Sequence, residues 1–155
     1  MNELSGRKVE LPHGATAWWP CHIGSDSIGE GTNIGALSHI GRNVSIGLNC
    51  RIQGSVYIAD GCSIGNEVFI GPSSVLTNDR HPPSKGLWKP VIVEDGVVIG
   101  ANATIVAGVR LHTGCVIAAG AVVTKDIPSQ EVWGGNPAKH MMDREEYDLR
   151  RDNYE

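Results

Sequence analysis

Residues 28–71 read IGEGTNIGALSHIGRNVSIGLNCRIQGSVYIADGCSIGNEVFIG, and an isoleucine stands at every sixth position of this stretch. Gly follows most of these isoleucines, where a bend without a Cβ costs least, and a small or β-branched residue comes four positions after each isoleucine. A period of six is neither that of an α-helix nor that of a coiled coil. It fits short parallel strands that bend between repeats and point two side chains per repeat inward.

The period extends to both sides of this stretch. Upstream, Leu11, Ala17 and Ile23 lie six apart, and a step of five then reaches Ile28. Downstream, the period resumes over residues 93–123. Because one repeat cannot bury its apolar face alone, successive turns must stack into an all-β solenoid with a narrow interior. Aromatic residues make up only 5 % of the chain, which agrees with such an interior.

The expected organisation is one β-helix domain over residues 1–155, with coils at about 11–76 and 91–128, an inserted loop at 77–90 and a tail at 129–155. The step from Leu76 to Val93 is one repeat plus an insertion of 11 residues. Long loops in compact folds are usually functional. Helix-forming residues and charge pairs at 143–151 predict a short C-terminal helix, which we expect to cap the open end of the stack.

Composition and charge exclude several functional classes. A net charge of −4 argues against a nucleic-acid partner. No apolar run reaches the ~20 residues that a membrane helix needs, and the N-terminus lacks a signal-peptide core, so we expect a cytoplasmic protein. The four cysteines form no C-x-x-C pair, and three of them occupy the small inward position, which favours buried side chains. The six histidines are scattered, so no metal site is expected.

The repeat I-G-x-x-x-x and the closing VWGGNPAK of residues 132–139 resemble the hexapeptide-repeat acyltransferases over residues 23–140. This resemblance implies a left-handed parallel β-helix, a homotrimer with sites at subunit boundaries, and acetyl-CoA along the coils. NCRIQGSVYI at 49–58 and VFIGPSSVLTNDRHPPS at 68–84 look like the branch that acetylates the 3-amino group of nucleotide-linked amino sugars. One position departs from that branch, because Pro83 stands where it commonly has Arg.

The inserted loop carries the candidate catalytic residues, His81 and Asn78. Acetyl transfer to an amine requires an unprotonated amine, aligned reactants and donors for the developing oxyanion. His81 is the candidate base or orienting group, because an exposed imidazole titrates near neutrality; a loop histidine bonded to backbone is the alternative. Asp79 is a candidate for binding sugar hydroxyls or the amine, unless it only forms a local turn with Asn78.

Further candidates for substrate binding lie on the coils and on the loop. Arg42, Asp60 and Asn78 are spaced by 18, one turn each, so they should stack on one face and either grip a nucleotide-sugar or form a solvated polar surface. His39, which precedes an inward isoleucine, is a further substrate candidate. Trp88 either stacks on a nucleobase or pins the loop to a neighbouring subunit.

The resemblance places acetyl-CoA on the second half of the chain. Small side chains there would let the pantetheine arm approach backbone donors, and lysines would meet its phosphates unless they are ordinary surface charges. The candidates are Ala107, Gly108, Ala118, Ala119, Gly120, Lys125, Pro137 and Lys139.

These features together predict an acetyl-CoA-dependent N-acetyltransferase that acts on the 3-amino group of a dTDP- or UDP-linked amino-deoxy sugar for surface-glycan biosynthesis. The alternative is an O- or N-acetyltransferase for another small sugar or xenobiotic acceptor. A non-catalytic solenoid, such as an ice-binding module, would show ladders of Thr that this sequence lacks. A zinc hydratase on the same fold would need a close pair of histidines, which is also missing.

Overall fold

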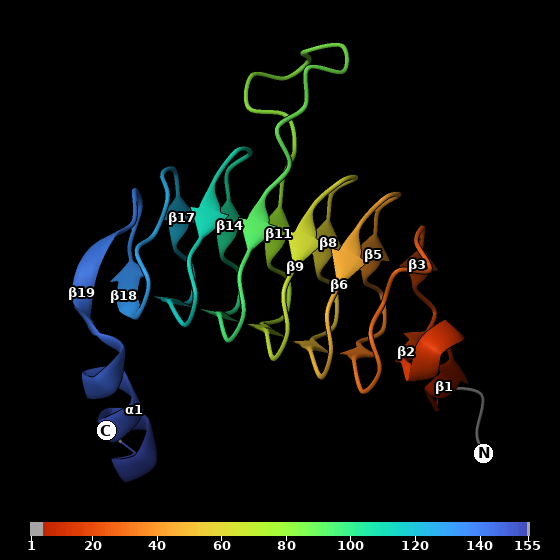
Figure 1. Ribbon diagram of the computed structural model, residues 1–155, viewed down its shortest axis with the longest axis horizontal. Coiled ribbons are helices and arrows are strands. Elements are labelled where there is room, and N and C mark those ends of the chain that lie inside the picture. The colour runs from red at the N-terminus through yellow and green to blue at the C-terminus, as the bar shows by residue number, and fades with distance from the viewer. Residues whose placement is uncertain (1–4, 155) are drawn as a thin grey trace.

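The computed structural model describes residues 5–154, which form a stack of turns with one strand of each full turn in each of three sheets (Figure 1). Sheet A contains β1 (Arg7–Glu10), β2 (Thr16–Trp19), β4 (Asn33–Ile34), β7 (Arg51–Ile52), β10 (Phe69–Ile70), β13 (Val98–Ile99), β16 (Val116–Ile117), β18 (Glu131–Gly134) and β19 (Lys139–Asp143). Sheet B contains β3 (His22–Ile23), β5 (His39–Ile40), β8 (Tyr57–Ile58), β11 (Val75–Leu76), β14 (Thr104–Ile105) and β17 (Val122–Val123). Sheet C contains β6 (Ser45–Ile46), β9 (Ser63–Ile64), β12 (Ile92–Val93) and β15 (Arg110–Leu111).

All strands within the stack pair in parallel, each with its counterpart one turn away. Ile34 lies opposite Ile52 and Ile52 opposite Ile70, so the partners are separated by three repeats of six. Ile23 lies opposite Ile40, one residue short of that spacing, which confirms the five-residue step near the N-terminus. The parallel β-solenoid predicted from the period is therefore confirmed. The antiparallel strands β1 and β19 complete sheet A at its two edges.

The core consists of the two inward positions of every repeat. The large inward residues, such as Ile34, Ile58 and Ile105, are fully buried, and so are the small residues four positions later. Cys50, Cys62 and Cys115 occupy this small position and are buried free thiols, as the repeat predicted. Burial raises the pKa of the Cys62 thiol to about 11 and that of Cys115 to about 12, so both stay protonated and unreactive.

The glycines that follow the inward isoleucines allow successive turns to approach closely, and the bend itself lies elsewhere. A Cβ on Gly29 would lie 2.6 Å from the carbonyl carbon of Gly47 in the next turn. The left-handed backbone falls two residues after this glycine position, at Leu37 (φ 64°), Asn43 (φ 55°) and Asn49 (φ 54°). The expectation that these glycines supply the bend was therefore wrong, and Asn often takes that conformation instead.

The C-terminal end of the core is closed by Trp133. This residue lies in β18 opposite Ile117, where an inward residue of the next turn would stand, and packs against the core. Its indole Nε1 donates to Glu131 Oε2 at 2.7 Å.

Helix α1 (Arg144–Asn153) is present but does not cap the stack. None of its residues is buried, and Figure 1 shows it beside the stack below β19. Arg144 anchors it by donating from Nη1 to the carbonyl oxygens of Gly96 (3.2 Å) and Gly114 (2.9 Å). The helix prediction was right within two residues, but the capping role was wrong because the β18–β19 pair already covers that end. In residues 5–154, no helix has the length and apolar character to cross a membrane.

Candidate active site

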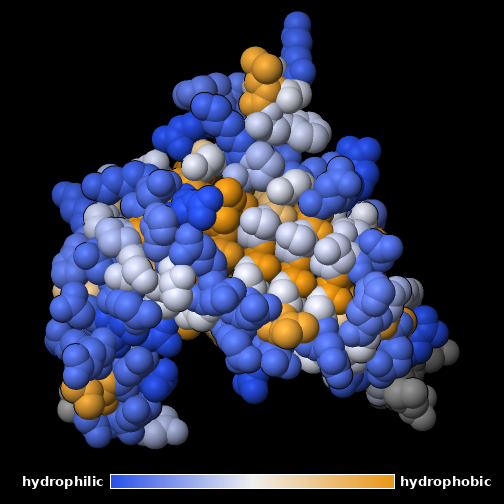
Figure 2. Space-filling view, viewed as in Figure 1, coloured by the Kyte–Doolittle hydropathy of each residue, from blue (hydrophilic) through white to orange (hydrophobic). Residues whose placement is uncertain are grey.

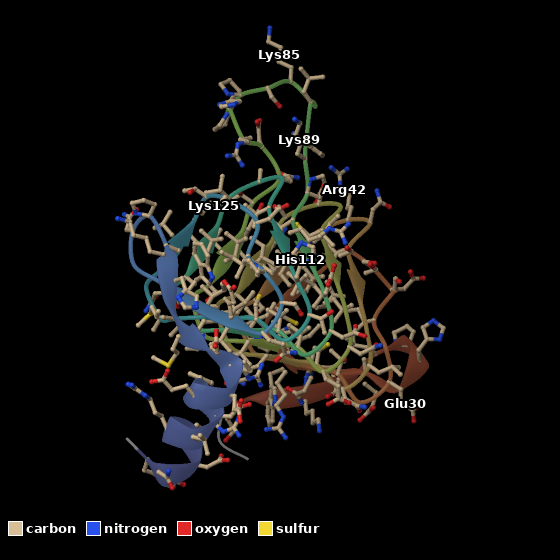
Figure 3. All side chains as sticks on the ribbon, turned by 60° about the vertical axis from the view of Figure 1, so that its left-hand side comes forward. Glu30, Arg42, Lys85, Lys89, His112 and Lys125 are labelled. Atoms are coloured by element: carbon tan, nitrogen blue, oxygen red, sulfur yellow. The ribbon has the colours of Figure 1, made fainter. Side chains whose placement is uncertain are left out.

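The inserted loop leaves the stack between β11 and β12, where the chain passes from sheet B to sheet C (Figure 1). We call this line of turns the B–C edge; its residues are Arg42, Asp60, Asn78, Ala107 and Lys125. Figure 3 shows Arg42, Lys89 and Lys125 on the side from which the loop projects, and Lys85 at the far end of the loop. The loop therefore projects from the same side of the stack as this edge.

Arg42, Asp60 and Asn78 form a connected row along the B–C edge, one turn apart, as their spacing predicted. Arg42 donates from its backbone amide to Asp60 Oδ1 at 2.9 Å and from Nη2 to Asp60 Oδ2 at 2.8 Å. Asn78 donates from Nδ2 to the carbonyl oxygen of Asp60 at 3.1 Å. The hydrogen bonds from the Arg42 amide and guanidinium lower the pKa of the Asp60 carboxyl. This row therefore fixes one cationic and one anionic side chain, Arg42 and Asp60, beside the base of the loop.

Asp79 shapes the loop from within. Its carboxylate accepts hydrogen bonds from the backbone amides of Ser84 (2.8 Å) and His81 (3.2 Å). The Ser84 amide is the main cause that lowers the pKa of the Asp79 carboxyl. At the base, the Lys89 amide donates to the carbonyl oxygen of Asn78 at 2.7 Å. Asp79 therefore forms a local turn, with Ser84 as its unforeseen partner, and its contact with the substrate stays a prediction.

His81 presents an exposed imidazole beside a hollow inside the loop. The hollow is lined by Asp79, Arg80, His81, Ser84, Leu87 and Lys89. Over residues 5–154, the His81 side chain has no hydrogen-bond partner, and only its backbone amide is engaged. The imidazole is therefore available to a ligand, in contrast to the alternative of a histidine that bonds to backbone.

Trp88 stands on the returning limb of the loop, with 46 % of its surface exposed. It faces a second hollow, at the base of the loop, whose other lining residues are Arg42, Asn43, Asp60, Gly61 and Pro90. An aromatic ring next to the Arg42–Asp60 ion pair offers one apolar and one charged wall. Such a site suits a planar, polar ligand.

His39 lies in a stack of three rings on the outer face of sheet B. Its ring centroid is 4.5 Å from that of His22 and 4.6 Å from that of Tyr57, with the rings nearly parallel. Burial, followed by the neighbouring His22, lowers the pKa of His39. The ring stack therefore lies on sheet B and not at the B–C edge. The chain reaches that edge three residues after each ring, at Arg42 after His39 and at Asp60 after Tyr57.

The candidate coenzyme residues separate into groups. Ala107, Gly108 and Lys125 lie on the B–C edge beside the loop, and the Lys89 side chain passes over Gly108. Within the described chain, no acceptor pairs with the Gly108 amide, which lies in an exposed left-handed turn. Lys125 has its Nζ 5.0 Å from the ring centroid of Trp133, in a cation–π contact.

The other coenzyme candidates lie away from the loop. Ala118, Ala119 and Gly120 occupy the edge where the chain passes from sheet A to sheet B. The amides of Ala118 and Gly120 already donate to neighbouring turns, each at 2.8 Å, so they are not free for a ligand. The last two candidates, Pro137 and Lys139, are exposed near the C-terminal end of the stack.

Arg80 is a site residue that the sequence reasoning missed. Its guanidinium donates from Nη1 to the carbonyl oxygen of Ala107 (2.9 Å) and from Nη2 to that of Thr124 (3.1 Å). These partners are 27 and 44 residues away, so no local pattern points to them. Only the six-residue period indicates that Ala107 and Thr124 lie at the B–C edge. In the part of the chain that the structure describes, no three His, Cys, Asp or Glu side chains gather as a metal site.

A family model described as "Hexapeptide repeat of succinyl-transferase" matches residues 26–60, 38–72 and 90–125, together more than half of the chain. The 2,3,4,5-tetrahydropyridine-2,6-dicarboxylate N-acetyltransferase of Staphylococcus aureus (strain JH9) is 50 % identical over 70 residues, 45 % of this chain and 28 % of that protein. The chain thus matches less than a third of the length of this curated relative.

Solved structures that share the fold include the following two. The hexapeptide-repeat acetyltransferase VCA0836 of Vibrio cholerae O1 biovar eltor, complexed with acetyl coenzyme A, has a TM-score of 0.50 and 27 % identity, over 84 % of this chain and 71 % of that one. PerB from Caulobacter crescentus, in complex with CoA and GDP-perosamine, has a TM-score of 0.66 and 24 % identity, over 84 % and 56 %. Because the repeat model covers more than half of the sequence and the strands follow its period, the chain belongs to the hexapeptide-repeat acyltransferase family.

Proposed function

We propose that the protein is an acetyl-CoA-dependent N-acetyltransferase whose acceptor is the 3-amino group of a nucleotide-linked amino sugar. The observation that carries this proposal is the inserted loop, which rises from the B–C edge and carries the unpaired imidazole of His81 beside a hollow. The remainder of the stack follows the repeat with little departure, so the loop is the place where this chain adds chemistry to the family scaffold.

The reaction needs a base, and His81 fits that role. The acceptor amine attacks the thioester carbon, its proton passes to His81 Nδ1 or Nε2, and coenzyme A leaves as the thiolate. General-base assistance of this kind contributes about 10²–10⁴-fold to the rate. The unpaired Gly108 amide, beside the returning limb of the loop, is suited to stabilise the developing oxyanion.

The hollow beside Trp88 supports a nucleotide-linked acceptor. Trp88 offers a face for a nucleobase, and Arg42 offers a cation for the diphosphate, although Asp60 shares it. PerB, which has the same fold, is described in complex with CoA and GDP-perosamine, and the Vibrio cholerae protein with acetyl coenzyme A. These names support an acyl-CoA donor and an amino-sugar acceptor.

The Staphylococcus aureus relative favours a second acceptor, a small dicarboxylate. It is named for N-acetylation of tetrahydropyridine dicarboxylate and shares 50 % identity over 70 residues. The ammonium group of Lys89, in the hollow beside His81, is compatible with a carboxylate as well as a phosphate. Substrate comparison decides between the two acceptors.

We also propose that the chain assembles as a homotrimer. Figure 2 shows one face of the stack with small and apolar residues in rows and few charged ones, over the part where β6 and β9 lie. Ser45, Ser63 and Ile92 point outward there from sheet C. Light scattering after size-exclusion chromatography should give about three times 16.5 kDa; a monomer mass would contradict the trimer.

The test of function follows thiol release from acetyl-CoA with a panel of acceptors. The panel contains dTDP- and UDP-linked 3-amino and 4-amino sugars, free amino sugars and tetrahydropyridine dicarboxylate. The proposal expects turnover with one nucleotide-linked 3-amino sugar. Turnover only with the dicarboxylate would favour the second acceptor, and no release with any acceptor would overturn the enzymatic assignment.

A further inference from the structure

The last turn of the stack is shorter than the others at the B–C edge. The step between its inward residues Val123 and Ile127 is four, whereas the step at this edge is six in the turns that begin at Ile40, Ile58 and Ile105. In an earlier turn, the amide three residues after the inward position donates to the carbonyl of the turn before, as Gly61 does to Arg42 at 2.9 Å. In the short turn the equivalent residue is Asp126, and its amide makes no such hydrogen bond. Among residues 5–154, no backbone amide therefore reaches the carbonyl oxygen of Ala107.

Arg80 supplies the missing donors. One guanidinium nitrogen donates to Ala107 O at 2.9 Å and the other to Thr124 O at 3.1 Å. The planar fork of Arg suits two acceptors on adjacent turns at once, which a single ammonium group cannot match. Ala107 is fully buried, and a buried carbonyl without a donor is costly, so the contact is strongly favoured.

Arg80, which directly precedes His81, is also the residue nearest to it whose side chain bonds the loop to the stack. Within the described part of the loop, side-chain hydrogen bonds to the coils come from Thr77, Asn78 and Arg80. After Arg80, the amides of His81 and Ser84 bond to Asp79, which is itself a loop residue. The place of the imidazole relative to the B–C edge thus depends on this guanidinium.

We propose that Arg80 is a positioning residue for acetyl transfer, which uses the shortened last turn as its anchor and holds His81 at the reacting amine. This inference rests on the proposed function and adds a residue that determines the rate without touching the substrate. It also explains why a short turn at one end of the stack accompanies a long loop in its middle. The carbonyl oxygens that have no backbone donor at the short turn are the acceptors that hold the loop.

The test compares Arg80→Ala, Arg80→Lys, His81→Ala and the double variant Arg80→Ala/His81→Ala, with Lys85→Ala as the matched control at the loop tip. Turnover is measured as kcat and as KM for acetyl-CoA. The rate of trypsin cleavage after Lys85 reports how firmly the loop is held, and it needs no substrate. The thermal midpoint verifies that the stack remains folded.

We expect Arg80→Ala to lower kcat about tenfold to a hundredfold with little change in KM for acetyl-CoA, because a misplacement of about 1 Å costs that much. Cleavage after Lys85 should accelerate, Arg80→Lys should lie in between, and Lys85→Ala should match the unmodified protein in turnover. The double variant should be no slower than His81→Ala alone, since Arg80 acts through His81.

Two results would overturn the inference. One is an unchanged kcat in Arg80→Ala, whether or not cleavage after Lys85 accelerates. The other is a double variant slower than His81→Ala by the full factor of Arg80→Ala. Full turnover of His81→Ala would instead contradict the role of His81 in the proposed function, and the cleavage rates would still show whether Arg80 holds the loop.

Discussion

The coils and the inserted loop are held by different kinds of interaction. Each turn of the coil bonds to the next through backbone hydrogen bonds and through ladders of buried Ile and Val side chains. The loop has almost no buried apolar residue and is held by side chains, namely Asn78, Asp79 and Arg80. Stability therefore resides in the repeat, while the groups suited to chemistry sit where the repeat is interrupted. Changes in one region should leave the other largely intact.

The largest effect should come from the loop and should spare stability. His81→Ala is expected to lower kcat by about 10²–10⁴-fold, the contribution of a general base. The thermal midpoint should not change, because His81 is exposed and its loss removes no buried contact. Thiol release and a melting curve on the same sample separate the two effects. A variant that kept full turnover would remove His81 from the mechanism.

The converse effect should come from the coil. Ile105→Ala removes a fully buried inward side chain and should lower the free energy of unfolding by about 2–5 kcal/mol. Thr104→Ala, the outward neighbour on the same strand, is the control and should cost less than about 0.5 kcal/mol. Urea unfolding measures both. Equal costs for the two variants would contradict the inward and outward assignment of the repeat.

A smaller effect should follow from loosening the loop alone. Asp79→Ala removes the acceptor for the His81 and Ser84 amides, so the loop should open more often. Trypsin cleavage after Lys85 is expected to accelerate about tenfold, as for one lost hydrogen bond to a charged group. The thermal midpoint should remain within about 2 °C, since few buried contacts are lost. An unchanged cleavage rate would mean that the carboxylate does not hold the loop.

The mildest effect concerns acid stability of the coil. Hydrogen bonds from Arg110, and then from Thr113, lower the pKa of Glu94 to about 2 from its usual 4.5. The folded state thus favours the ionised carboxylate, and this stabilisation is present above about pH 4.5 and lost as the pH falls toward 2. Melting curves between pH 6 and 2 should decline less steeply for Glu94→Gln. Parallel curves for both proteins would contradict the shift.

The sequence predicted the coil far better than the loop, and the reason is physical. The period of six repeats one local rule many times, so the inward residues Ile34 to Val123, the buried cysteines and the row of Arg42, Asp60 and Asn78 were all readable. The role of the glycines was misread because close approach and left-handed backbone both favour glycine. The cap was misread because a lone Trp133 at an inward position closes the core before the helix begins.

The contacts within the site were largely beyond sequence reasoning. His81 and Trp88 were marked by their place in the insertion, but the anchoring of Arg80 depends on a shortened turn 44 residues away. The sequence shows that the step from Val123 to Ile127 is two residues shorter than a repeat. Only the fold shows that carbonyl oxygens near this step accept from the loop. Ala118 and Gly120 were chosen for small size, whereas their amides are already used between turns.

Removal of the loop tests most directly the claim that stability and chemistry are separate. Deletion of residues 79–89 joins Asn78 to position 90 and restores a step of six from Leu76 to Val93. Pro90→Gly completes the repair, because the equivalent residues Gly61 and Gly108 have positive φ. The account predicts a cooperatively folded stack, with a thermal midpoint within a few degrees of the full chain, that no longer releases thiol from acetyl-CoA with any acceptor. A shortened chain that unfolds, or one that still turns over, would contradict it.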